Sequence, residues 1–112
     1  MRGYNPDRWI VVHITGKDIP PIDKIFACWY GGYAGSDSWR LNSGIAKVSL
    51  QDSVFCFEGI SGSVYECNKD NYGTNMYGQS IISRMIENAK NAGISVEILP
   101  EETNWLERDY AN

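Results

Sequence analysis

One helical pattern in an otherwise strand-like chain constrains the fold most. Apolar residues recur at helical spacing at Ile81, Ile82, Met85, Ile86 and Ala89, which form a single stripe along a helix. Upstream, short apolar or alternating segments are separated by turns rich in glycine and proline, as β-strands are. One helix among several strands predicts an α+β fold, in which the helix packs on one face of an antiparallel sheet.

The ends of this helix are marked by residues that suit helix termini. Thr74 or Asn75 can accept a hydrogen bond from a free backbone N–H at the start. Lys90 lies in the last turn, where a cation complements the helix dipole, and Gly93 suits a left-handed C-terminal cap. We therefore expect a helix over residues 75–92.

Strands are expected on both sides of the helix. The predicted segments are 8–14, 24–30, 39–50, 54–58, 63–68 and 94–99, which would form one antiparallel sheet of about five to six strands. Residues 8–14 are apolar on both faces, which indicates a central strand. Gly59 to Gly62 separates two strand segments, and we interpret them as a hairpin rather than one strand bent at a bulge. Residues 19–22 include Pro20 and Pro21 and predict an extended connector.

Length and composition predict a single domain. The chain has 112 residues, of which 43% are apolar, enough for one modest core and well above the level of disordered chains. We divide it into an N-terminal arm over residues 1–7, the sheet and helix over residues 8–99, and a tail over residues 100–112. Trp105 and Leu106 can dock the tail on the body, and residues 110–112 are expected to be loose.

Charge and cysteine content exclude several function classes. Ten basic and fourteen acidic residues give a net charge of −4 without any basic run, which disfavours direct nucleic-acid binding. The three cysteines, an odd number without paired spacing, predict reduced and buried thiols rather than a disulfide framework. No signal-peptide or membrane-helix pattern is found, so we expect a cytoplasmic protein with no membrane partner.

Catalysis and metal binding have few candidate residues. His13 is the only histidine and lies in an apolar strand, where a core or sheet-surface position is the better interpretation. The cysteines lack the paired spacing of zinc ligands, and Gly35-Ser36 lacks the lysine of a P-loop. We therefore predict a protein that is not an enzyme, with no catalytic residue, no cofactor and no metal site.

The segment from Gly31 to Gly44 is the first candidate for recognition. Its glycines permit close backbone approach, its aromatic rings can stack on a planar group, and Arg40 can bind a phosphate or carboxylate through two N–H groups. The candidate residues are Tyr33, Trp39, Arg40, Asn42 and Ser43. The alternative is a hairpin loop followed by a strand, with Trp39 in the core and Arg40 an ordinary surface base.

Two further groups of residues are candidates for anion binding. Ser61 and Ser63 flank a glycine near a turn whose N–H groups can hold an anion, the alternative being a plain turn or bulge. Lys69 and Tyr72 lie at the entry to the helix, where free N–H groups attract anions, the alternative being a capped helix with tyrosines on the sheet edge. If Arg40, the serines and the helix start converge, they form a pocket for a phosphorylated or nucleotide-like ligand. Otherwise the surface would bind a protein.

Two strings carry a resemblance to a known group of proteins. They are Ser36-Asp37-Ser38-Trp39-Arg40-Leu41-Asn42-Ser43-Gly44-Ile45 and Gly59-Ile60-Ser61-Gly62-Ser63-Val64-Tyr65, with Lys69 and Tyr72-Gly73 downstream. The chain thereby resembles small uncharacterised proteins encoded by tailed phages and prophages. The resemblance implies an accessory factor that binds a host or defence component, or that captures a signalling nucleotide.

The resulting expectation is a non-catalytic phage-type inhibitor. It would bind a host or anti-phage defence protein in the cytoplasm of the bacterial host, through the aromatic and polar surface around Trp39 and Arg40. The alternative is a sponge for a nucleotide or phosphorylated signal, held around Arg40 and residues 61–63. Both interpretations leave open a homo-oligomer.

Overall fold

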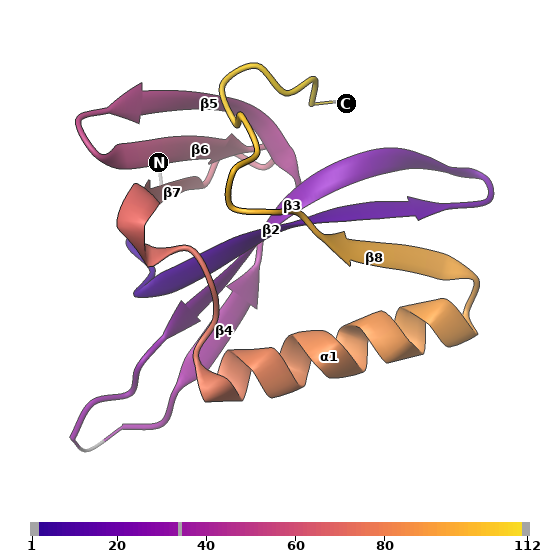
Figure 1. The fold of residues 1–112 in the computed structure, drawn as a ribbon, viewed down its shortest axis with the longest axis horizontal. Coiled ribbons are helices and arrows are strands. Elements are labelled where there is room, and N and C mark those ends of the chain that lie inside the picture. The colour runs from indigo at the N-terminus through magenta and orange to yellow at the C-terminus, as the bar shows by residue number, and fades with distance from the viewer. Residues whose placement is uncertain (1–2, 34, 111–112) are drawn as a thin grey trace.

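Two four-stranded sheets and one α-helix make up the described chain (Figure 1). The computed structural model of the protein describes residues 3–33 and 35–110. Sheet A contains β1 (Gly3–Tyr4), β5 (Ile45–Gln51), β6 (Val54–Gly59) and β7 (Val64–Asn68). Sheet B contains β2 (Arg8–Gly16), β3 (Ile19–Trp29), β4 (Ser38–Leu41) and β8 (Ile94–Ile98). Helix α1 spans Met76–Asn91, and a short 3-10 helix, η1, spans Lys69–Asn71.

The predicted α+β class is confirmed, but the predicted single sheet of five to six strands is wrong. The strand order is β1-β7-β6-β5 in sheet A and β4-β3-β2-β8 in sheet B. β1 pairs parallel with β7, and the other strand pairs of the described chain are antiparallel. The segment predicted as an N-terminal arm therefore contains a strand of sheet A.

A corner at Asn42 to Gly44 explains why there are two sheets. The sequence predicted one strand over residues 39–50, whereas β4 and β5 lie on either side of this corner in different sheets. The Asn42 Oδ1 atom accepts hydrogen bonds from the backbone N–H groups of Ile25 at 2.8 Å and Gly44 at 3.2 Å. Gly44 has a φ of 133°, and a Cβ there would lie 2.5 Å from Ile22 Cδ1. A side chain at Gly44 would be strained at this φ and would require Ile22 to move, and the chain leaves sheet B here to begin sheet A.

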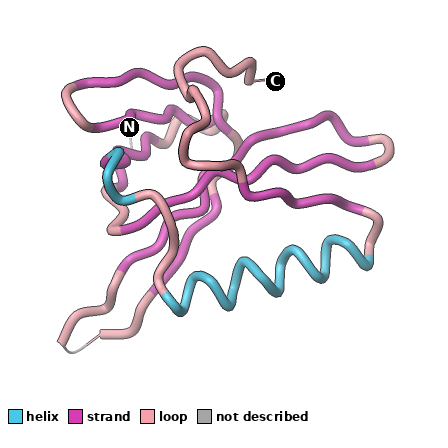
Figure 2. Tube along the Cα trace, in the orientation of Figure 1, coloured by secondary structure: helices cyan, strands magenta, loops and turns pink. Residues whose placement is uncertain are grey.

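Sheet B is the middle layer of the molecule, with sheet A on one face and α1 on the other (Figures 1 and 2). Trp9 of β2 belongs to the core between the sheets, where it packs with Phe57 of sheet A. The next residue, Ile10, belongs to the core under the helix, together with Ile82. The prediction that residues 8–14 form a central strand is therefore confirmed.

Helix α1 lies within one residue of its predicted limits. Asn75 caps its start, because Asn75 Oδ1 accepts a hydrogen bond of 2.6 Å from the Gly78 N–H. Lys90 lies in the last turn, and Gly93 has a φ of 80°, as the sequence predicted. The described ranges contain no helix that is long and apolar enough to cross a membrane.

The strand connections match the predictions in one case and differ in another. β6 and β7 pair antiparallel, which confirms the hairpin. Pro20 and Pro21 lie within β3 rather than in a connector, because the two prolines oppose Thr15 alone at an irregularity of the β2–β3 ladder. A bulge tolerates proline, which has no N–H group to donate to a neighbouring strand.

The C-terminal tail is held on the core between the sheets. Trp105 is buried in that core, as predicted, whereas Leu106 is exposed. Tyr110 packs against the same core and donates a hydrogen bond of 2.6 Å to the Trp105 carbonyl, so it is not loose. The other two residues expected to be loose, 111 and 112, lie outside the described residues.

Candidate functional site

A hollow of about 380 Å³ lies where β4, the Asn42–Gly44 corner and the β6–β7 turn meet. Arg40 and Ser43 line it from the first two elements, and Ser61 and Ser63 line it from the turn. Lys24, Leu41, Asn42 and Tyr65 complete its lining. We refer to this site as the Arg40 hollow. It brings together two groups of residues that the sequence presented as separate candidates.

The Arg40 hollow is cationic on a protein of opposite charge. Its lining includes Lys24 and Arg40 and, among the described residues, no carboxylate, whereas the whole chain carries a net charge of −4. Local charge in a concave site outweighs the distant and screened charges of the rest of the surface. The hollow is therefore suited to an anion.

Two tyrosines position the Arg40 side chain. The guanidinium carbon lies 4.7 Å from the centre of the Tyr4 ring, a distance at which cation–π attraction operates. Tyr4 in turn stacks on Tyr65, with ring centres 4.8 Å apart. Burial raises the pKa of the Tyr65 hydroxyl, an effect that the charge and hydrogen bond of Arg40 partly offset. Because one face of the guanidinium is fixed on a ring, its N–H edge is directed in advance of binding.

Ser43 and Ser61 join the corner to the β6–β7 turn. The Ser43 hydroxyl donates to Ser61 Oγ over 3.0 Å, and the Ser61 backbone N–H donates to Ser43 Oγ, also over 3.0 Å. The turn is closed internally by a 2.7 Å hydrogen bond from the Gly59 N–H to the Ser63 carbonyl. These bonds hold both serine hydroxyls at the rim of the hollow.

Asn42 is one of the lining residues, but its side chain stabilises the corner at residues 42–44. Its side chain is buried, its Oδ1 atom accepts from two backbone N–H groups, and its Nδ2 atom lies 3.4 Å from the Gly44 carbonyl oxygen. Since both polar ends of the amide are used internally, Asn42 shapes the hollow rather than offering a free donor.

The two aromatic candidates of this segment do not line the hollow. Trp39 precedes Arg40 in β4, so its side chain lies on the opposite face of the strand. There it stacks on Phe26 at a centroid distance of 5.5 Å, and the residue is 37% exposed. Tyr33 is fully exposed in the loop between β3 and β4. The predicted stacking platform beside Arg40 is thus not formed by either ring.

Lys69 and Tyr72 line a different and smaller hollow, of about 210 Å³, together with Trp9 and Trp105. The Tyr72 hydroxyl accepts from the Val11 N–H at 3.1 Å and donates to the Leu99 carbonyl at 2.6 Å. Burial raises the pKa of Tyr72 to about 12. As acceptor and donor, the Tyr72 hydroxyl links Val11 of β2 to Leu99, the residue that follows β8. Tyr72 therefore has a structural role.

The start of α1 is occupied by the protein's own side chains. Asn75 Oδ1 caps the helix, and its Nδ2 atom lies 3.5 Å from Asp37 Oδ2. Asp37 also accepts a 2.8 Å hydrogen bond from the Gly31 N–H, so its carboxylate is fixed beside the helix N-terminus. An internal anion already complements the helix dipole at the position where the sequence suggested a ligand.

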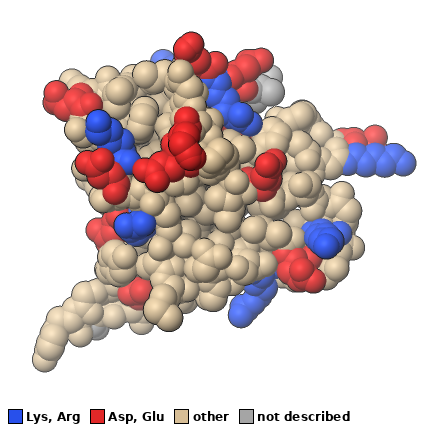
Figure 3. Space-filling model, viewed as in Figure 1, with Lys and Arg blue, Asp and Glu red and all other residues tan. Residues whose placement is uncertain are grey.

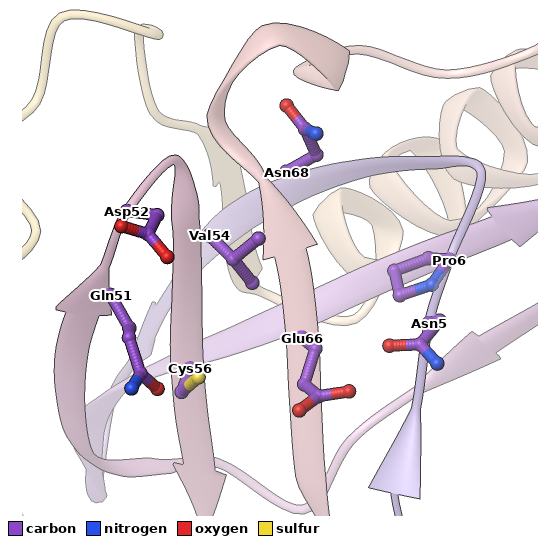
Figure 4. A pocket seen from close by; sticks show the side chains of 8 residues that line it. All are labelled: Asn5, Pro6, Gln51, Asp52, Val54, Cys56, Glu66 and Asn68. Atoms are coloured by element: carbon purple, nitrogen blue, oxygen red, sulfur yellow. The ribbon is translucent and has the colours of Figure 1, made fainter.

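Another hollow, of about 400 Å³, lies on the face of sheet A that points away from the core (Figure 4). Its lining includes the carboxylates of Asp52 and Glu66 and the half-buried thiol of Cys56. Asn5, Pro6, Gln51, Val54 and Asn68 complete it. Two carboxylates without a lining cation repel an anion, so this hollow does not share the chemistry of the first one.

A group of polar and charged residues holds the tail, and of these only His13 was considered from the sequence. Asp23 Oδ1 lies 2.7 Å from His13 Nδ1, and Arg108 Nε donates to Asp23 Oδ2. The hydrogen bond to Asp23 raises the pKa of Arg108. His13 is thus a half-buried member of a hydrogen-bonded group on β2, β3 and the tail, which includes the ion pair of Arg108 with Asp23. Within the described ranges, no three His, Cys, Asp or Glu residues are grouped so that they could hold a metal ion.

Three residues of the Arg40 hollow were absent from the sequence-based candidates, namely Lys24, Leu41 and Tyr65. Lys24 precedes an apolar strand segment, and Tyr65 follows the second serine. Lys24 and Tyr65 belong to other strands than Arg40, and a period-2 pattern does not show which residues of different strands lie close together. Their proximity to Arg40 depends on the pairing of β3 with β4 and on the packing of the two sheets.

Fold and site together define an α+β protein with a cationic hollow at the junction of two sheets. Comparison of the chain with protein-family models, with curated proteins and with solved structures gives no match. The function proposed below therefore rests on the geometry of the site.

Proposed function

We propose that the protein is a non-catalytic binding protein that captures a phosphorylated or nucleotide-like small molecule in the Arg40 hollow. The observation that carries this proposal is the meeting of Arg40, Ser43, Ser61 and Ser63 in one hollow without a carboxylate. Arginine guanidinium groups and hydroxyl groups are donors that proteins use to bind phosphate oxygens. In the phage context that the sequence resemblance implies, capture would remove a signalling nucleotide from the host.

The chemistry of the lining supports binding rather than turnover. The described residues that line the hollow include no histidine and no carboxylate, the usual general acids and bases. His13 is instead paired with Asp23 beneath the tail. A ligand in the hollow would meet donors that hold its charge, with no histidine or carboxylate among the described lining residues beside it.

Thermal unfolding with a panel of nucleotides and phosphorylated metabolites tests the proposal. A ligand that binds only the folded state adds about 2.7 kcal/mol at a hundredfold excess over its dissociation constant, so at least one compound should raise the melting temperature by several degrees. Arg40→Ala should abolish that rise, while Arg84→Ala on the exposed face of α1 removes the same charge and should preserve it. If no compound of the panel stabilises the protein, the proposal is wrong.

Inhibition of a host or defence protein is a second candidate function, which the loop between β3 and β4 favours. This loop projects from the body and carries no charged side chain over residues 30–36 (Figures 1 and 3). Tyr33 is fully exposed on it. Its base is fixed by 2.8 Å hydrogen bonds from the Tyr30 N–H to Asp7 and from the Gly31 N–H to Asp37. A loop with a fixed base and an exposed tyrosine suits insertion into a cleft of a partner protein.

Substitution of Tyr33 distinguishes this candidate from small-molecule capture. If the loop binds a partner, Tyr33→Ala should lose a bacterial protein that the wild type retains in affinity capture, because tyrosine anchors often contribute about 2 kcal/mol or more. Arg40→Ala and Leu106→Ala, which alter other parts of the surface, should retain it. Equal capture by all four proteins would count against the loop as an interface.

A further inference from the structure

The Arg40 hollow has features that narrow the class of its ligand. We propose that it holds the terminal phosphate of a phosphomonoester and recognises this group independently of any base attached to it. The inference rests on the proposed function and specifies the part of the ligand that the protein contacts. Its support comes from the charge of the lining, the directions of the hydroxyl hydrogen bonds and the exposure of the lining aromatic residue.

The charge of the lining matches a dianion. Arg40 contributes a positive charge, Lys24 is a second cationic residue of the lining, and none of the described lining residues is a carboxylate that would offset them. A phosphomonoester carries about −1.5 to −2 at pH 7, because its second pKa is about 6, whereas a phosphodiester carries only −1. A monoester therefore gains more electrostatic free energy in this hollow than a cyclic or bridging diester does.

The serine pair has one hydroxyl hydrogen left for a ligand. Ser43 Oγ uses its hydrogen to donate to Ser61 Oγ, and it accepts from the Ser61 N–H. We assign the shared hydrogen to Ser43, so that Ser61 Oγ is the acceptor of this pair and its own hydrogen remains free to donate into the hollow. A hydroxyl that already accepts a hydrogen bond is a stronger donor, because chains of hydrogen bonds polarise one another. Ser61 therefore donates a hydrogen bond to the ligand, and Ser43 positions the Ser61 hydroxyl.

Arg40 supplies a second directed contact. Its guanidinium lies 4.7 Å from the centre of the Tyr4 ring and hydrogen-bonds the Tyr65 hydroxyl, and its remaining N–H groups can pair with two oxygens of one phosphate. Together with Ser61 and Ser63, this gives donors to the three terminal oxygens that only a monoester presents. A diester has two such oxygens and would leave part of the donor set unused.

The lining has no exposed ring on which a base could stack. Tyr65 is the aromatic residue among those that line the hollow, and its side chain is buried against Tyr4 and the core. Trp39 lies on the other face of β4. Base stacking normally adds substantial affinity and discriminates nucleotides from simpler phosphates. Without it, a sugar phosphate and a nucleoside monophosphate should bind with similar affinity.

Calorimetric titration with four compounds tests the inference: ribose 5-phosphate, AMP, 3′,5′-cyclic AMP and adenosine. We expect ribose 5-phosphate and AMP to have dissociation constants within about threefold of each other, since both present the same phosphate. The diester should bind at least tenfold more weakly, and adenosine should not bind. Each titration is made at one fixed ionic strength, because screening weakens all charged contacts.

Serine variants test the assigned directions of the hydrogen bonds. Ser61→Ala should weaken AMP binding by at least tenfold, and Ser43→Ala should weaken it less. In the Ser61→Ala background, Ser43→Ala should add little, because a positioning residue has no effect once the group it positions is gone. Ser49→Ala on the exposed outer part of β5 is the matched control and should leave binding unchanged.

The outcomes separate the inference from the proposed function. Tighter binding of cyclic AMP than of AMP, or binding of AMP without ribose 5-phosphate, would overturn the phosphomonoester inference and leave capture of a nucleotide intact. If the losses of AMP affinity in the Ser43→Ala and Ser61→Ala variants simply add in the double variant, Ser43 does not position the Ser61 hydroxyl, and that part of the inference is wrong. If neither these compounds nor the wider panel bind, both the inference and the proposed function are wrong.

Discussion

Trp9→Ala should lower the free energy of unfolding by about 4 kcal/mol, the largest loss that we expect from a single truncation. The Trp9 ring is 1% exposed and packs against the rings of Phe57, Tyr72 and Trp105. Its Nε1–H donates a 2.7 Å hydrogen bond to the Asn68 carbonyl, which the substitution leaves unpaired. Because domains of this size are stable by only about 5–15 kcal/mol, urea denaturation should show a clear fall in the midpoint.

Trp39→Ala is the matched control for this measurement. The same atoms are removed, but Trp39 is 37% exposed and stacks mainly on Phe26, so the loss should be about 1–2 kcal/mol. Trp9→Phe should fall between the two, since it keeps a ring and loses the N–H. Equal losses at Trp9 and Trp39 would contradict the assignment of Trp9 to the core that unites the two sheets and the tail.

Arg108→Ala should lower the free energy of unfolding by about 3 kcal/mol, the second large effect. The Asp23 side chain is only 4% exposed, so removal of Arg108 leaves a buried carboxylate with His13 as its remaining partner. Loss of one member of a buried pair costs about 3–5 kcal/mol, and the lower end applies because Arg108 itself is 27% exposed. Arg84→Ala on the exposed face of α1 should change stability by less than about 0.5 kcal/mol.

A second substitution, at Asp23, distinguishes two contributions to the lost stability. These are the lost attraction between Arg108 and Asp23, and the cost of leaving the Asp23 carboxylate buried without that cation. In the Arg108→Ala background, Asp23→Asn keeps the shape of the side chain and removes the charge, so it should restore part of the lost stability. Asp23→Asn alone should destabilise, because the charge-assisted bonds to Arg108 are then lost. If the double variant is as unstable as the sum of the two single variants, the pair is not coupled as the structure indicates.

Local patterns in the sequence were sufficient for the elements whose features lie close together in the chain. The stripe from Ile81 to Ala89, a capping side chain at Asn75 and a terminal Gly93 correctly placed α1. Apolar residues on both faces of residues 8–14 correctly identified a central strand. Such features follow from the helical and strand periods, which involve only residues a few positions apart in the chain.

The number of sheets could not be predicted in this way. Residues 39–50 alternate as one strand would, and the break at Asn42 depends on a hydrogen bond that the Ile25 N–H, 17 residues away, donates to the Asn42 side chain. Likewise, Asp23 and Arg108 are 85 residues apart and meet only because the tail folds back over the core. A periodic pattern has no information on partners at such separations.

The Arg40 hollow combines both kinds of information. The residue types at Arg40, Ser43, Ser61 and Ser63 indicated anion recognition from the chain alone, because guanidinium and hydroxyl groups are suited to phosphate wherever they are exposed. Their assembly into one hollow, with Trp39 excluded and Lys24 included, arises from the corner at residues 42–44 and the packing of sheet A on sheet B. Chemistry is a property of each side chain, whereas convergence depends on contacts between distant segments that only the folded core establishes.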